Sequence, residues 1–532
     1  MVSIAVLSAT SLSASAERFT IQVENNHKGV VKALAKKLGG DIHLDGNGFI
    51  AASFTGKDLA QVKGLLNNPH IKLVEVDQKR ALMSIYNDDA GEPMAGQITP
   101  YAVYQSQADQ VSFNGAAGMK VCVIDSGLDR SNTDFTWNNI TGDNDSGTGN
   151  WDDNGGPHGT HVAGTIAAED NNVGVVGMAP SVDLHIVKVF NADGWGYSSD
   201  LAHATDKCTA AGANIISMSL GGGRANSTEE NAFNAFTEAG GLVVAAAGND
   251  GNNVRSYPAG YPSVMMIGAN DADNNIADFS QYPNCGKGRR RDEGTCVEVT
   301  AGGVDTLSTY PADMATASNL TADGNFYASS AMENSGSVSG STYYMGTAEA
   351  THAGANGNIC VIDRGNISFH DKVQNCENSG GVAAIIINNE AGMLYGTLGD
   401  TNATSIPAVG TAFEDRAALI AASSASVNVG TSDYGFMSGT SMATPAVSGI
   451  AALVWSNHNA CTGTDIRNAL KATATGSGNR INDKFGYGIV KAASADAYLS
   501  EFGCAGDSGN GGGDDNEEPP VCRGGPKKCP NK

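Results

Sequence analysis

The spacing of apolar residues divides the chain into regions with different periods. In the first region, residues 17 to about 80, alternating runs predict strands and runs of period 3.6 predict helices. Strands are predicted at Phe19–Val23, Phe49–Phe54 and Ile71–Val76, and helices at Val30–Leu38 and Asp58–Leu66. This mixture predicts a small unit of helices and strands.

From about residue 95 the apolar runs are continuous, and they alternate with helical patterns. Continuous apolar strands are typical of a parallel sheet that helices bury on both faces. The sequence therefore predicts an α/β fold with helices on both faces of a parallel sheet. Strands are expected at Lys120–Ile124, Leu184–Val189, Ile215–Leu220, Leu242–Ala246 and Pro262–Gly268, and helices at His158–Ala168, Ser199–Ala211 and Glu229–Ala239.

Residues 312–430 interrupt this order with strands of their own. The helical pattern resumes only at Ser441 and continues to Trp455. An inserted, β-rich domain is therefore expected over residues 312–430. Its predicted strands are Ile359–Ile362, Val382–Ile387 and Ile406–Val409.

Both ends of the chain differ from these units in composition. Residues 1–16 contain a short apolar run and end in Ala14-Ser15-Ala16, which is typical of a signal peptide and predicts secretion. Residues 505–520 are rich in glycine, aspartate and glutamate and predict a flexible linker ahead of a basic tail. No later stretch reaches the apolar length of a transmembrane helix, so no membrane anchor is expected.

The ten cysteines include no Cys-x-x-Cys pair and no zinc-like Cys/His spacing. In a secreted chain, an even number of cysteines at short intervals predicts disulfides. Cys122 on a strand and Cys208 on a helix either pair or stay as buried thiols. The other expected pairs are Cys285–Cys296, Cys360–Cys376, Cys461–Cys504 and Cys522–Cys529.

Composition sets limits on size and partners. A length of 532 residues exceeds one hydrophobic core and predicts two to four domains. The 32 lysines and arginines stand against 56 aspartates and glutamates, a net charge of -24. Such a surface repels nucleic acid and anionic membranes, so neither is expected as a partner. Its carboxylates could supply the oxygen ligands that Ca²⁺ prefers.

Three polar residues could form a hydrolytic site. Ser441 lies between a Gly-Thr turn and a helical run, where free backbone N–H groups can stabilise negative charge. His158 begins a predicted helix, and Asp125 ends a buried strand just before a glycine turn. In open parallel sheets, ligands bind at this end of the strands. A nucleophilic serine needs a base, and the base needs a group that orients it.

Each of these residues also has a plain structural interpretation. A serine at a helix start is more often a helix cap, and a single histidine is usually structural or exposed. The order aspartate, histidine, serine, each in its own sequence frame, is one that chance rarely provides. It is the order found in subtilisin.

The chain resembles the subtilase family of serine proteases. The matching segments are Val123–Gly127, His158–Thr165, Ser219–Gly222, Ala245–Asn249 and Gly439–Pro445. The resemblance implies a subtilisin-like fold in which Ser441 is the nucleophile, His158 the general base and acid, and Asp125 the residue that orients the histidine. It also implies that His161 is a structural residue of its helix.

The resemblance further implies how a substrate binds. The Asn249 side chain and the Ser441 N–H would donate to the oxyanion, although Asn249 could instead be a plain turn residue. A peptide would add as a strand between two edges of the protein. The residues implied at these edges are Gly194, Trp195, Gly196, Ser219, Leu220 and Gly221.

The primary specificity pocket would be walled by Ala246, Ala247 and Gly248. Walls of small residues indicate a broad or apolar preference. Asp250 lies at the expected rim, where it would either admit a basic side chain or remain a solvated surface aspartate.

Residues 169–175, Glu-Asp-Asn-Asn-Val-Gly-Val, resemble the calcium-binding loop of the family. The alternative is an ordinary polar loop that has lost its metal. Oxygen atoms are the ligands that Ca²⁺ prefers, and a bent loop can supply several of them. The implied ligands are the side chains of Asp134, Asn171 and Gln97 and the carbonyl groups of Glu169, Val173 and Val175.

The insertion has a resemblance of its own. Cys360–Gly365, Phe369, Lys372 and Gly380–Ile386 resemble a protease-associated domain. This non-catalytic domain is usually credited with contacts to substrate or partner. The alternative is a module that binds carbohydrate or matrix.

Together these features predict the precursor of a secreted, extracellular serine endopeptidase that acts as a monomer on proteins or peptides through an acyl-enzyme. Its own propeptide would inhibit it until self-processing, and Ca²⁺ would be structural. The alternatives are a pseudoenzyme that keeps the fold for binding and an independent binding domain in place of the propeptide. The expected parts are a signal peptide (1–16), an inhibitory propeptide (17–94, with its end between 80 and 96), a subtilisin-like catalytic domain (95–311 and 431–504), an inserted protease-associated domain (312–430) and a linker with a cysteine-containing tail (505–532).

Overall fold

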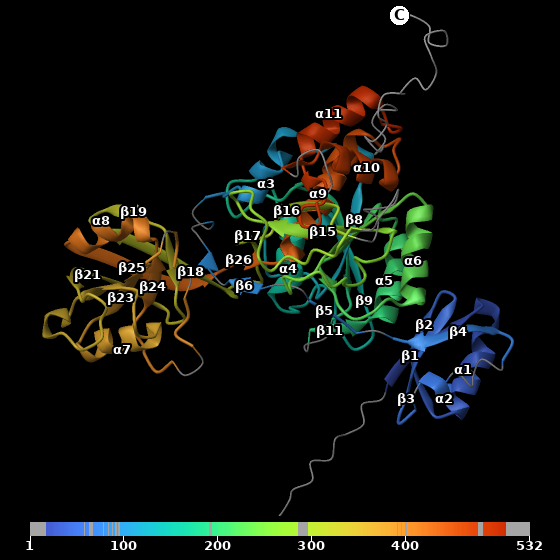
Figure 1. Cartoon of the computed structure of the whole chain (residues 1–532), viewed down its shortest axis with the longest axis horizontal. Helices are drawn as coiled ribbons and strands as arrows, with labels where there is room; N and C mark the ends of the chain where they lie inside the picture. The colour runs from blue at the N-terminus through green and yellow to red at the C-terminus, as the bar shows by residue number, and fades with distance from the viewer. Residues whose placement is uncertain are drawn as a thin grey trace, which may run out of the picture.

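The described residues form three units, each built on a large sheet of its own (Figure 1). The central unit lies between an amino-terminal unit, drawn in blue, and an inserted unit, drawn in yellow and orange (Figure 1). The computed structural model describes residues 17–506 except 58, 63–67, 78, 83–84, 88, 91–92, 94–95, 191–193, 286–295, 391, 395, 400–401 and 477–481.

The central sheet has the strand order β27-β28-β16-β15-β14-β12-β8-β10-β9. Its described strands are parallel to their neighbours from β28 to β9, and β27 alone is antiparallel. The predicted α/β fold with a parallel sheet is therefore confirmed. The strands are β8 Lys120–Asp125, β9 Ile140–Asn144, β10 Asp183–Lys188, β12 Ile215–Met218, β14 Leu242–Ala246, β15 Val264–Asn270, β16 Val299–Gly302, β27 Thr475–Gly476 and β28 Gly488–Ile489.

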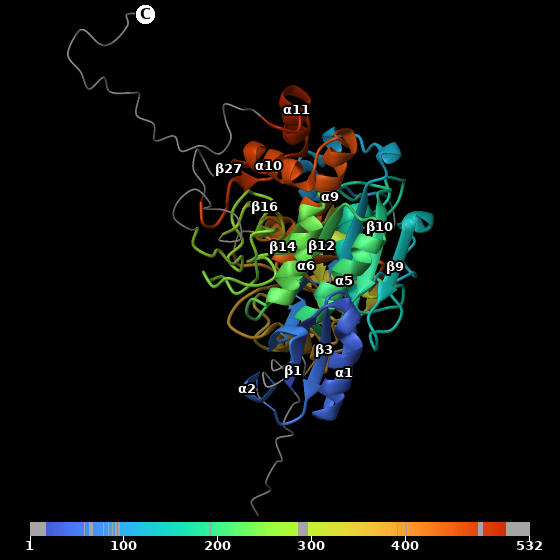
Figure 2. The same cartoon turned by 90° about the vertical axis from the view of Figure 1, so that its right-hand side faces the viewer.

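Successive side chains of the central strands enter two separate cores, because a strand alternates its faces. On β8, Val121 and Val123 pack into the core that contains α4 and α9, whereas Cys122 and Ile124 pack against α5 and α6. Figure 2 shows α5 and α6 side by side in front of the sheet. The helices are α3 Tyr101–Gln105, α4 Pro157–Ala167, α5 Ser198–Ala210, α6 Ser227–Glu238, α9 Thr440–Asn457, α10 Gly463–Thr473 and α11 Ala492–Phe502.

The amino-terminal unit is an antiparallel sheet of order β2-β3-β1-β4. Phe19, Ile21 and Phe54 pack in its core against Val31 of α1. One strand, β2, was not predicted, because its sequence has few apolar residues and lies at a sheet edge. The elements are β1 Glu17–Val23, α1 Lys28–Lys37, β2 Gly40–Gly46, β3 Phe49–Phe54, α2 Leu59–Val62 and β4 Ile71–Val76.

The inserted unit is built on a mixed sheet of order β19-β18-β25-β21-β22-β23-β24-β20. Strands β21 to β24 are parallel, whereas β18, β25 and β21 form an antiparallel group. The elements are β18 Ala315–Ala322, β19 Asn325–Tyr327, β20 Ser329–Ala331, β21 Gly336–Tyr344, β22 Ile359–Asp363, α7 Phe369–Asn378, β23 Ala383–Ile387, β24 Ala408–Thr411, α8 Arg416–Ala421 and β25 Ser424–Ser432.

The inserted unit leaves the central unit from the end of a strand pair. Strand β17 (Thr306–Thr309) is antiparallel to β26 (Tyr434–Ser438), and Thr309 lies opposite Tyr434. The two ends of the insertion therefore lie side by side, where a short turn would otherwise join the strands.

Four disulfides connect the described cysteines. The bond between Cys122 and Cys208 ties β8 to α5 and settles the question that the sequence left open. Cys522 and Cys529, which were expected to pair, lie outside the described residues, as does the predicted signal peptide. The other three bonds are those predicted, Cys285–Cys296, Cys360–Cys376 and Cys461–Cys504.

Candidate active site

Two buried polar residues meet at the carboxyl end of β8. Asp125 is the last residue of that strand, and His158 is the second residue of α4. Nδ1 of His158 lies 2.8 Å from Oδ1 of Asp125, and both side chains are at most 1% exposed. Because a carboxylate accepts, Nδ1 of the imidazole must donate, which leaves Nε2 of a neutral ring as the proton acceptor.

Two glycines allow α4 to approach the loop after β8. A Cβ atom at Gly159 would lie 2.1 Å from the carbonyl oxygen of Gly127. Gly127 has φ of +102°, a region that favours glycine. Gly127 and Gly159 thus allow the close backbone contact that brings the side chains of Asp125 and His158 together.

Ser441 is the second residue of α9 and is fully buried. Its hydroxyl donates to the carbonyl of Ser219 at 3.0 Å, and the Ser219 hydroxyl donates to the carbonyl of Ser441 at 2.6 Å. Ser219 directly follows β12, the neighbour of β8 in the sheet. Among the described residues, none forms a hydrogen bond with Nε2 of His158.

Asn249 comes shortly after strand β14, from which Ala247 and Gly248 separate it. Its Oδ1 accepts from the backbone N–H and the hydroxyl of Thr440, at 2.9 and 2.8 Å. The amide oxygen thus faces the start of α9, and the NH₂ group is directed away from it. Thr440 was not predicted as a site residue; its place directly before Ser441 was the only signal in the sequence.

A segment of the chain itself, residues 79–82, lies along the predicted substrate edges. Strand β5 (Lys79–Leu82) is antiparallel to both β11 (Trp195–Tyr197) and β13 (Leu220–Gly221) and lies between them. Ala81 lies opposite both Trp195 and Gly221. Gly194 and Ser219 directly precede the two edge strands. The predicted edges therefore do hold a peptide strand, which comes from this same chain.

Carboxylates of the amino-terminal unit bind the starts of two helices of the central unit. Glu75 accepts from the backbone N–H groups of Ser227 and Thr228, at the start of α6. Asp77 accepts from the Ser199 N–H at 2.7 Å, at the start of α5. Negative charge is stabilised at a helix amino terminus, so these contacts fasten the amino-terminal unit to α5 and α6.

A buried ion pair reinforces this interface. Arg18 contacts Asp77 at 2.8 Å and Asp200 at 2.5 Å. Burial raises the pKa of Asp200 to about 6, although the nearby Arg18 charge acts in the opposite direction. Removing one partner of such a buried ion pair lowers the free energy of unfolding by about 3–5 kcal/mol.

A family model for subtilases matches residues 116–337 and 324–488, more than half of the chain. The chain belongs to the subtilase family. It is 39% identical to subtilisin BL of Lederbergia lenta over 224 residues, which cover 40% of this chain and 76% of that protein. It is 38% identical to subtilisin DY of Bacillus licheniformis over 232 residues, 42% of this chain and 80% of the relative.

A solved structure supports the same assignment. The psychrophilic subtilisin-like protease Apa1 of Pseudoalteromonas sp. AS-11 superposes with a TM-score of 0.63 at 37% identity. The match covers 77% of this chain and 99% of the Apa1 chain. This subtilase is therefore a subtilisin-type serine endopeptidase.

The subtilase also gathers the implied calcium ligands around Asp134, which is 2% exposed. Its carboxylate accepts from the Asn171 amide and the Val175 N–H, each at 2.9 Å. Gln97 donates to the carbonyl of Glu169 at 2.7 Å. Gly174 has φ of +73°, and a Cβ atom there would lie 2.2 Å from Oδ2 of Asp134.

The donor set around Asp134 fits a hard cation. Burial raises the pKa of this carboxyl to about 6; the N–H of Val175 and the amide of Asn171 lower it, and the charge of Glu169 raises it. Only neutral donors thus offset the burial of the carboxylate charge. The carboxylate, amide and carbonyl oxygens of these residues are of the kind that binds Ca²⁺. In this structure the N–H groups of Asn171 and Val175 contact the Asp134 carboxylate. Val173, the remaining implied ligand, donates its N–H to Oδ1 of Asn171.

The remaining residues named in the sequence analysis differ in their exposure to solvent. Ala246, Ala247 and Gly248 are buried at the end of β14, and Asp250 is exposed to solvent. His161 is fully buried, and its Nε2 lies 2.8 Å from the carbonyl oxygen of Thr306. Burial lowers the pKa of His161 to about 3, so this ring is neutral in the folded protein.

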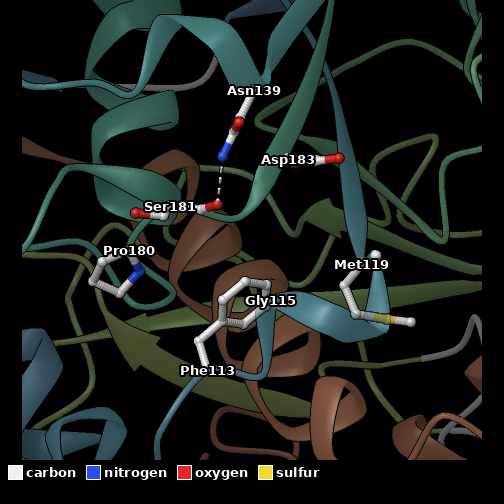
Figure 3. A pocket seen from close by; sticks show the side chains of 8 residues that line it. Phe113, Gly115, Met119, Asn139, Pro180, Ser181 and Asp183 are labelled. Atoms are coloured by element: carbon white, nitrogen blue, oxygen red, sulfur yellow. Dashed lines mark hydrogen bonds between the residues drawn. The ribbon is translucent and has the colours of Figure 1, made fainter.

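A surface pocket of about 390 Å³ lies at the opposite end of the central sheet (Figure 3). Its lining includes Met119, directly before β8, and Asp183, at the start of β10. Asp125 is the last residue of β8, at the other end of that strand, and His158 lies beside it. The pocket therefore lies apart from Asp125 and His158.

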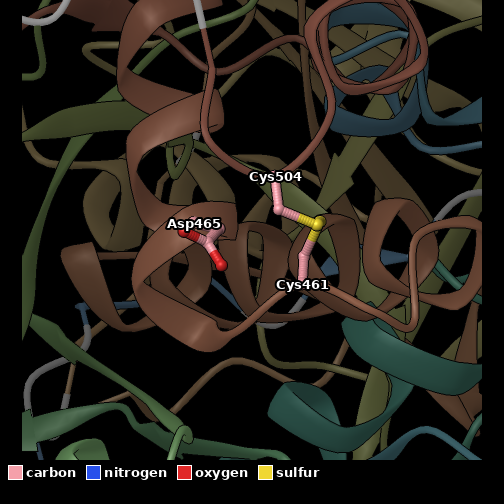
Figure 4. A group of neighbouring side chains, drawn as sticks. All are labelled: Cys461, Asp465 and Cys504. Atoms are coloured by element: carbon pink, nitrogen blue, oxygen red, sulfur yellow. A yellow bond between two sulfur atoms is a disulfide. The ribbon is translucent and has the colours of Figure 1, made fainter.

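Among the described residues, one cluster has metal-ligating side chains close together: Cys461, Asp465 and Cys504 (Figure 4). The two sulfur atoms are joined in a disulfide and provide no thiolate. Asp465 caps α10 by accepting from the N–H and hydroxyl of Thr462. None of the helices in the residues that the structure describes has the length and apolar character to span a membrane.

Proposed function

We propose that this subtilase hydrolyses peptide bonds with Ser441 as nucleophile, His158 as general base and Asp125 as the residue that orients the histidine. Ser441 attacks the peptide carbonyl while Nε2 of His158 takes its proton. The imidazolium then gives that proton to the leaving amine, which breaks the C–N bond and leaves an acyl-enzyme. Water, activated by the same histidine, releases the acid. The 2.8 Å contact between His158 and Asp125 supports these roles.

The negative oxygen of the tetrahedral intermediate would be bound by the Asn249 amide and the Ser441 N–H. The two bonds from Thr440 to the Asn249 oxygen support this role, because they direct the NH₂ group away from α9. The Ser441 N–H lies in the first turn of α9, where backbone donors are not used by the helix itself. Pre-oriented donors stabilise charge without having to reorganise during the reaction.

The strand Lys79–Leu82 between β11 and β13 is the observation that carries the proposal. A substrate held in the same way would be recognised mainly through its backbone, and many sequences could bind. Small residues at Ala246, Ala247 and Gly248 favour a broad or apolar primary specificity. Because β5 lies within a longer chain, with β4 before it and β6 (Ile85–Asn87) after it, cleavage within a chain is favoured over cleavage at its end.

The amino-terminal unit would be an inhibitory propeptide. It blocks the edges that a substrate needs and fastens to α5 and α6 through Glu75, Asp77 and Arg18. Self-processing by Ser441 would then begin maturation. The signal peptide at residues 1–16 and the four disulfides favour secretion into an oxidising, extracellular space.

Calcium would be structural in this enzyme. The ion would be held by the side chains of Asp134, Asn171 and Gln97. The backbone carbonyl groups of Glu169, Val173 and Val175, in the loop 169–175, would complete its ligands. The ion would supply charge compensation for the buried carboxylate and take no part in the hydrolysis. The inserted unit, residues 312–430, would be a protease-associated domain that contacts substrate or partner, and the enzyme would act as a monomer.

Substitution of the nucleophile tests this function. Ser441→Ala should abolish peptide hydrolysis and leave the precursor uncut in a protease-free expression system. Ser448→Ala, another buried serine of α9, is the matched control and should still mature. A Ser441→Ala protein that cuts itself under these conditions would disprove the assignment.

A further inference from the structure

A proline removes one backbone donor from α9 close to the proposed nucleophile. In an α-helix each N–H donates to the carbonyl four residues earlier, so the carbonyl of Ser441 would accept from position 445. Pro445 stands there, inside α9, and a proline has no N–H. Its ring also crowds the carbonyl four residues before it. The helix therefore cannot supply the ordinary donor to the Ser441 carbonyl.

A side chain from the central sheet supplies a donor at this carbonyl instead. The hydroxyl of Ser219 donates to the carbonyl oxygen of Ser441 at 2.6 Å, and both residues are fully buried. In return the Ser441 hydroxyl donates to the Ser219 carbonyl at 3.0 Å. The two residues thus hold each other where β12 ends and α9 begins.

The position of Ser219 just after β12 directs its side chain toward α9. A strand sends alternate side chains to one face, so Ile215, Ser217 and Ser219 share a face. Ile215 packs in the core that contains α9. The hydroxyl oxygen of Ser217 lies 2.9 Å from that of Ser448, about two turns along the helix from Ser441. Two serines of the sheet thus contact α9, and only Ser219 contacts it at Ser441.

We propose that the Ser219 hydroxyl positions the nucleophile by taking the place of the helix donor that Pro445 removes. Holding the Ser441 carbonyl fixes the backbone angles of this residue. These angles set the direction of its Cα–Cβ bond, which carries the hydroxyl, and of its N–H, the proposed oxyanion donor. The Ser219 hydroxyl acts through Ser441 and not on the substrate itself. The inference rests on the proposed function of Ser441.

This role is separate from the place of Ser219 beside the substrate edge. Ser219 directly precedes β13, in which Gly221 lies opposite Ala81 of the bound strand. Recognition at this edge uses the backbone, which a change of side chain leaves in place. Removing the hydroxyl should therefore affect the chemical step more than the binding of a peptide.

Kinetics of the mature Ser219→Ala enzyme test the positioning role. For a peptide substrate kcat should fall about 5- to 100-fold, as for a buried acceptor that is left unpaired, while KM changes less than about twofold. Ser217→Ala is the matched control, because it removes a buried hydroxyl that faces the same helix farther from Ser441. Equal losses of kcat in the two variants, or a change confined to KM, would overturn the inference.

Pro445→Ala tests the cause of this dependence. Alanine restores the N–H that a helix donates to the Ser441 carbonyl, so the Ser219 hydroxyl should matter less. In the Pro445→Ala background, adding Ser219→Ala should lower kcat at most about threefold, which is less than in the parent. Losses that simply multiply in the double variant would contradict the replacement of one donor by the other.

Further variants keep the test decisive if Ser219→Ala does not mature. Ser219→Cys keeps a side chain of similar size with a weak donor and should show a similar loss of kcat. If neither variant matures, adding Pro445→Ala should restore maturation, and failure to do so would overturn the inference. Ser441→Ala separates the two claims. Hydrolysis by Ser441→Ala at the parental rate would refute the proposed function, whereas an inactive Ser441→Ala beside a fully active Ser219→Ala refutes only the positioning role.

Discussion

Two polar side chains of the candidate active site are held in place by hydrogen bonds to residues that are distant in sequence. Asp125 orients His158, and Thr440 orients Asn249 through two hydrogen bonds. Each pair joins residues far apart in sequence, so the geometry depends on α4 and α9 packing on one face of the sheet. Loss of a positioning group should therefore have smaller effects than loss of the group that it positions.

Asn249→Leu should lower kcat with little change in KM, because its amide would act mainly on the oxyanion. A loss of about 10²- to 10³-fold is the value known for removing such a donor from subtilisin itself. Thr440→Val, which removes only the hydroxyl, should cost about tenfold or less in kcat. Adding Thr440→Val to Asn249→Leu should cost nothing more; steady-state kinetics of the double variant would contradict this positioning role if the two losses multiply.

His161 should make the stability depend on pH. Its pKa is lowered to about 3 in the folded protein from an ordinary value of 6.5, so below pH 6.5 the unfolded chain binds a proton that the folded protein does not. Its contribution to stability is therefore present above pH 6.5 and is lost as the pH falls, by about 1.4 kcal/mol per pH unit.

This dependence can be isolated by substitution in the inactive Ser441→Ala protein. His161→Gln keeps a donor for the Thr306 carbonyl and removes the titration. Between pH 7.5 and 5.5, urea unfolding should show a steeper fall in stability for the parent than for the His161→Gln variant. Parallel pH profiles would be inconsistent with a buried neutral His161.

The sequence frames indicated which residues would meet at the end of β8, because Asp125 and His158 lie in motifs with fixed neighbours. They did not indicate that the Ser441 hydroxyl donates to the Ser219 carbonyl in this structure. A hydroxyl has several acceptors within reach, and the one it chooses depends on side-chain rotation, which no spacing encodes.

The helices α5 and α6 connect the central unit with the amino-terminal unit. Their first turns receive Asp77 and Glu75 from the same end of β4. The backbone donors at a helix start have no partner within the helix, and these carboxylates accept from them. At α6 the Asn226 side chain shares this task, because it also accepts from the N–H of Thr228. The amino-terminal unit is thus bound by the amino-terminal ends of two helices.

Glu75→Ala in the Ser441→Ala precursor should expose the start of α6. The amide of Ser227 should exchange with deuterium about 5- to 30-fold faster, as expected for losing a cap worth about 1–2 kcal/mol. The amide of Thr228 should change less, because it also donates to Asn226. Glu24→Ala, an exposed carboxylate of the same unit, is the control. Unchanged exchange at the Ser227 amide would rule out capping by Glu75.

Elements with continuous apolar runs were the ones that could be predicted. Strand β14 has the predicted bounds, and β8 and β15 differ from prediction by one and two residues at their ends. The long strands β18, β21 and β25 were not predicted, because serine, threonine and glycine fill their exposed positions. Their apolar alternation is short and weak, and only pairing between distant segments makes them strands.

At the level of the whole molecule, the inserted unit and the central unit are joined through adjacent strand ends at β17 and β26. The sequence predicted an insertion because residues 312–430 interrupt the alternation of strands and helices with strands of their own. The strands β6 (Ile85–Asn87) and β7 (Asp89–Ala90) could not be predicted, because two such short strands carry no period. Only their pairing with β26 and β18 makes them strands.

Calcium should stabilise the whole protein through the loop 169–175. In the inactive Ser441→Ala protein, an ion that binds only the folded state adds about 2.7 kcal/mol at a hundredfold excess over its Kd. Calcium should therefore raise the melting temperature, and chelation should lower it. The rise should be smaller when Asp134→Ala is added; equal rises would remove Asp134 from the metal site.

Identification of the residue that reacts with a serine-directed fluorophosphonate tests the central claim most directly. The processed wild-type enzyme should carry one adduct, on the peptide that contains Ser441, and peptide hydrolysis should fall in proportion to labelling. Ser441→Ala should carry none, whereas Ser448→Ala should label normally. An adduct on another residue, or full hydrolysis by a labelled enzyme, would contradict a mechanism in which Ser441 is the nucleophile.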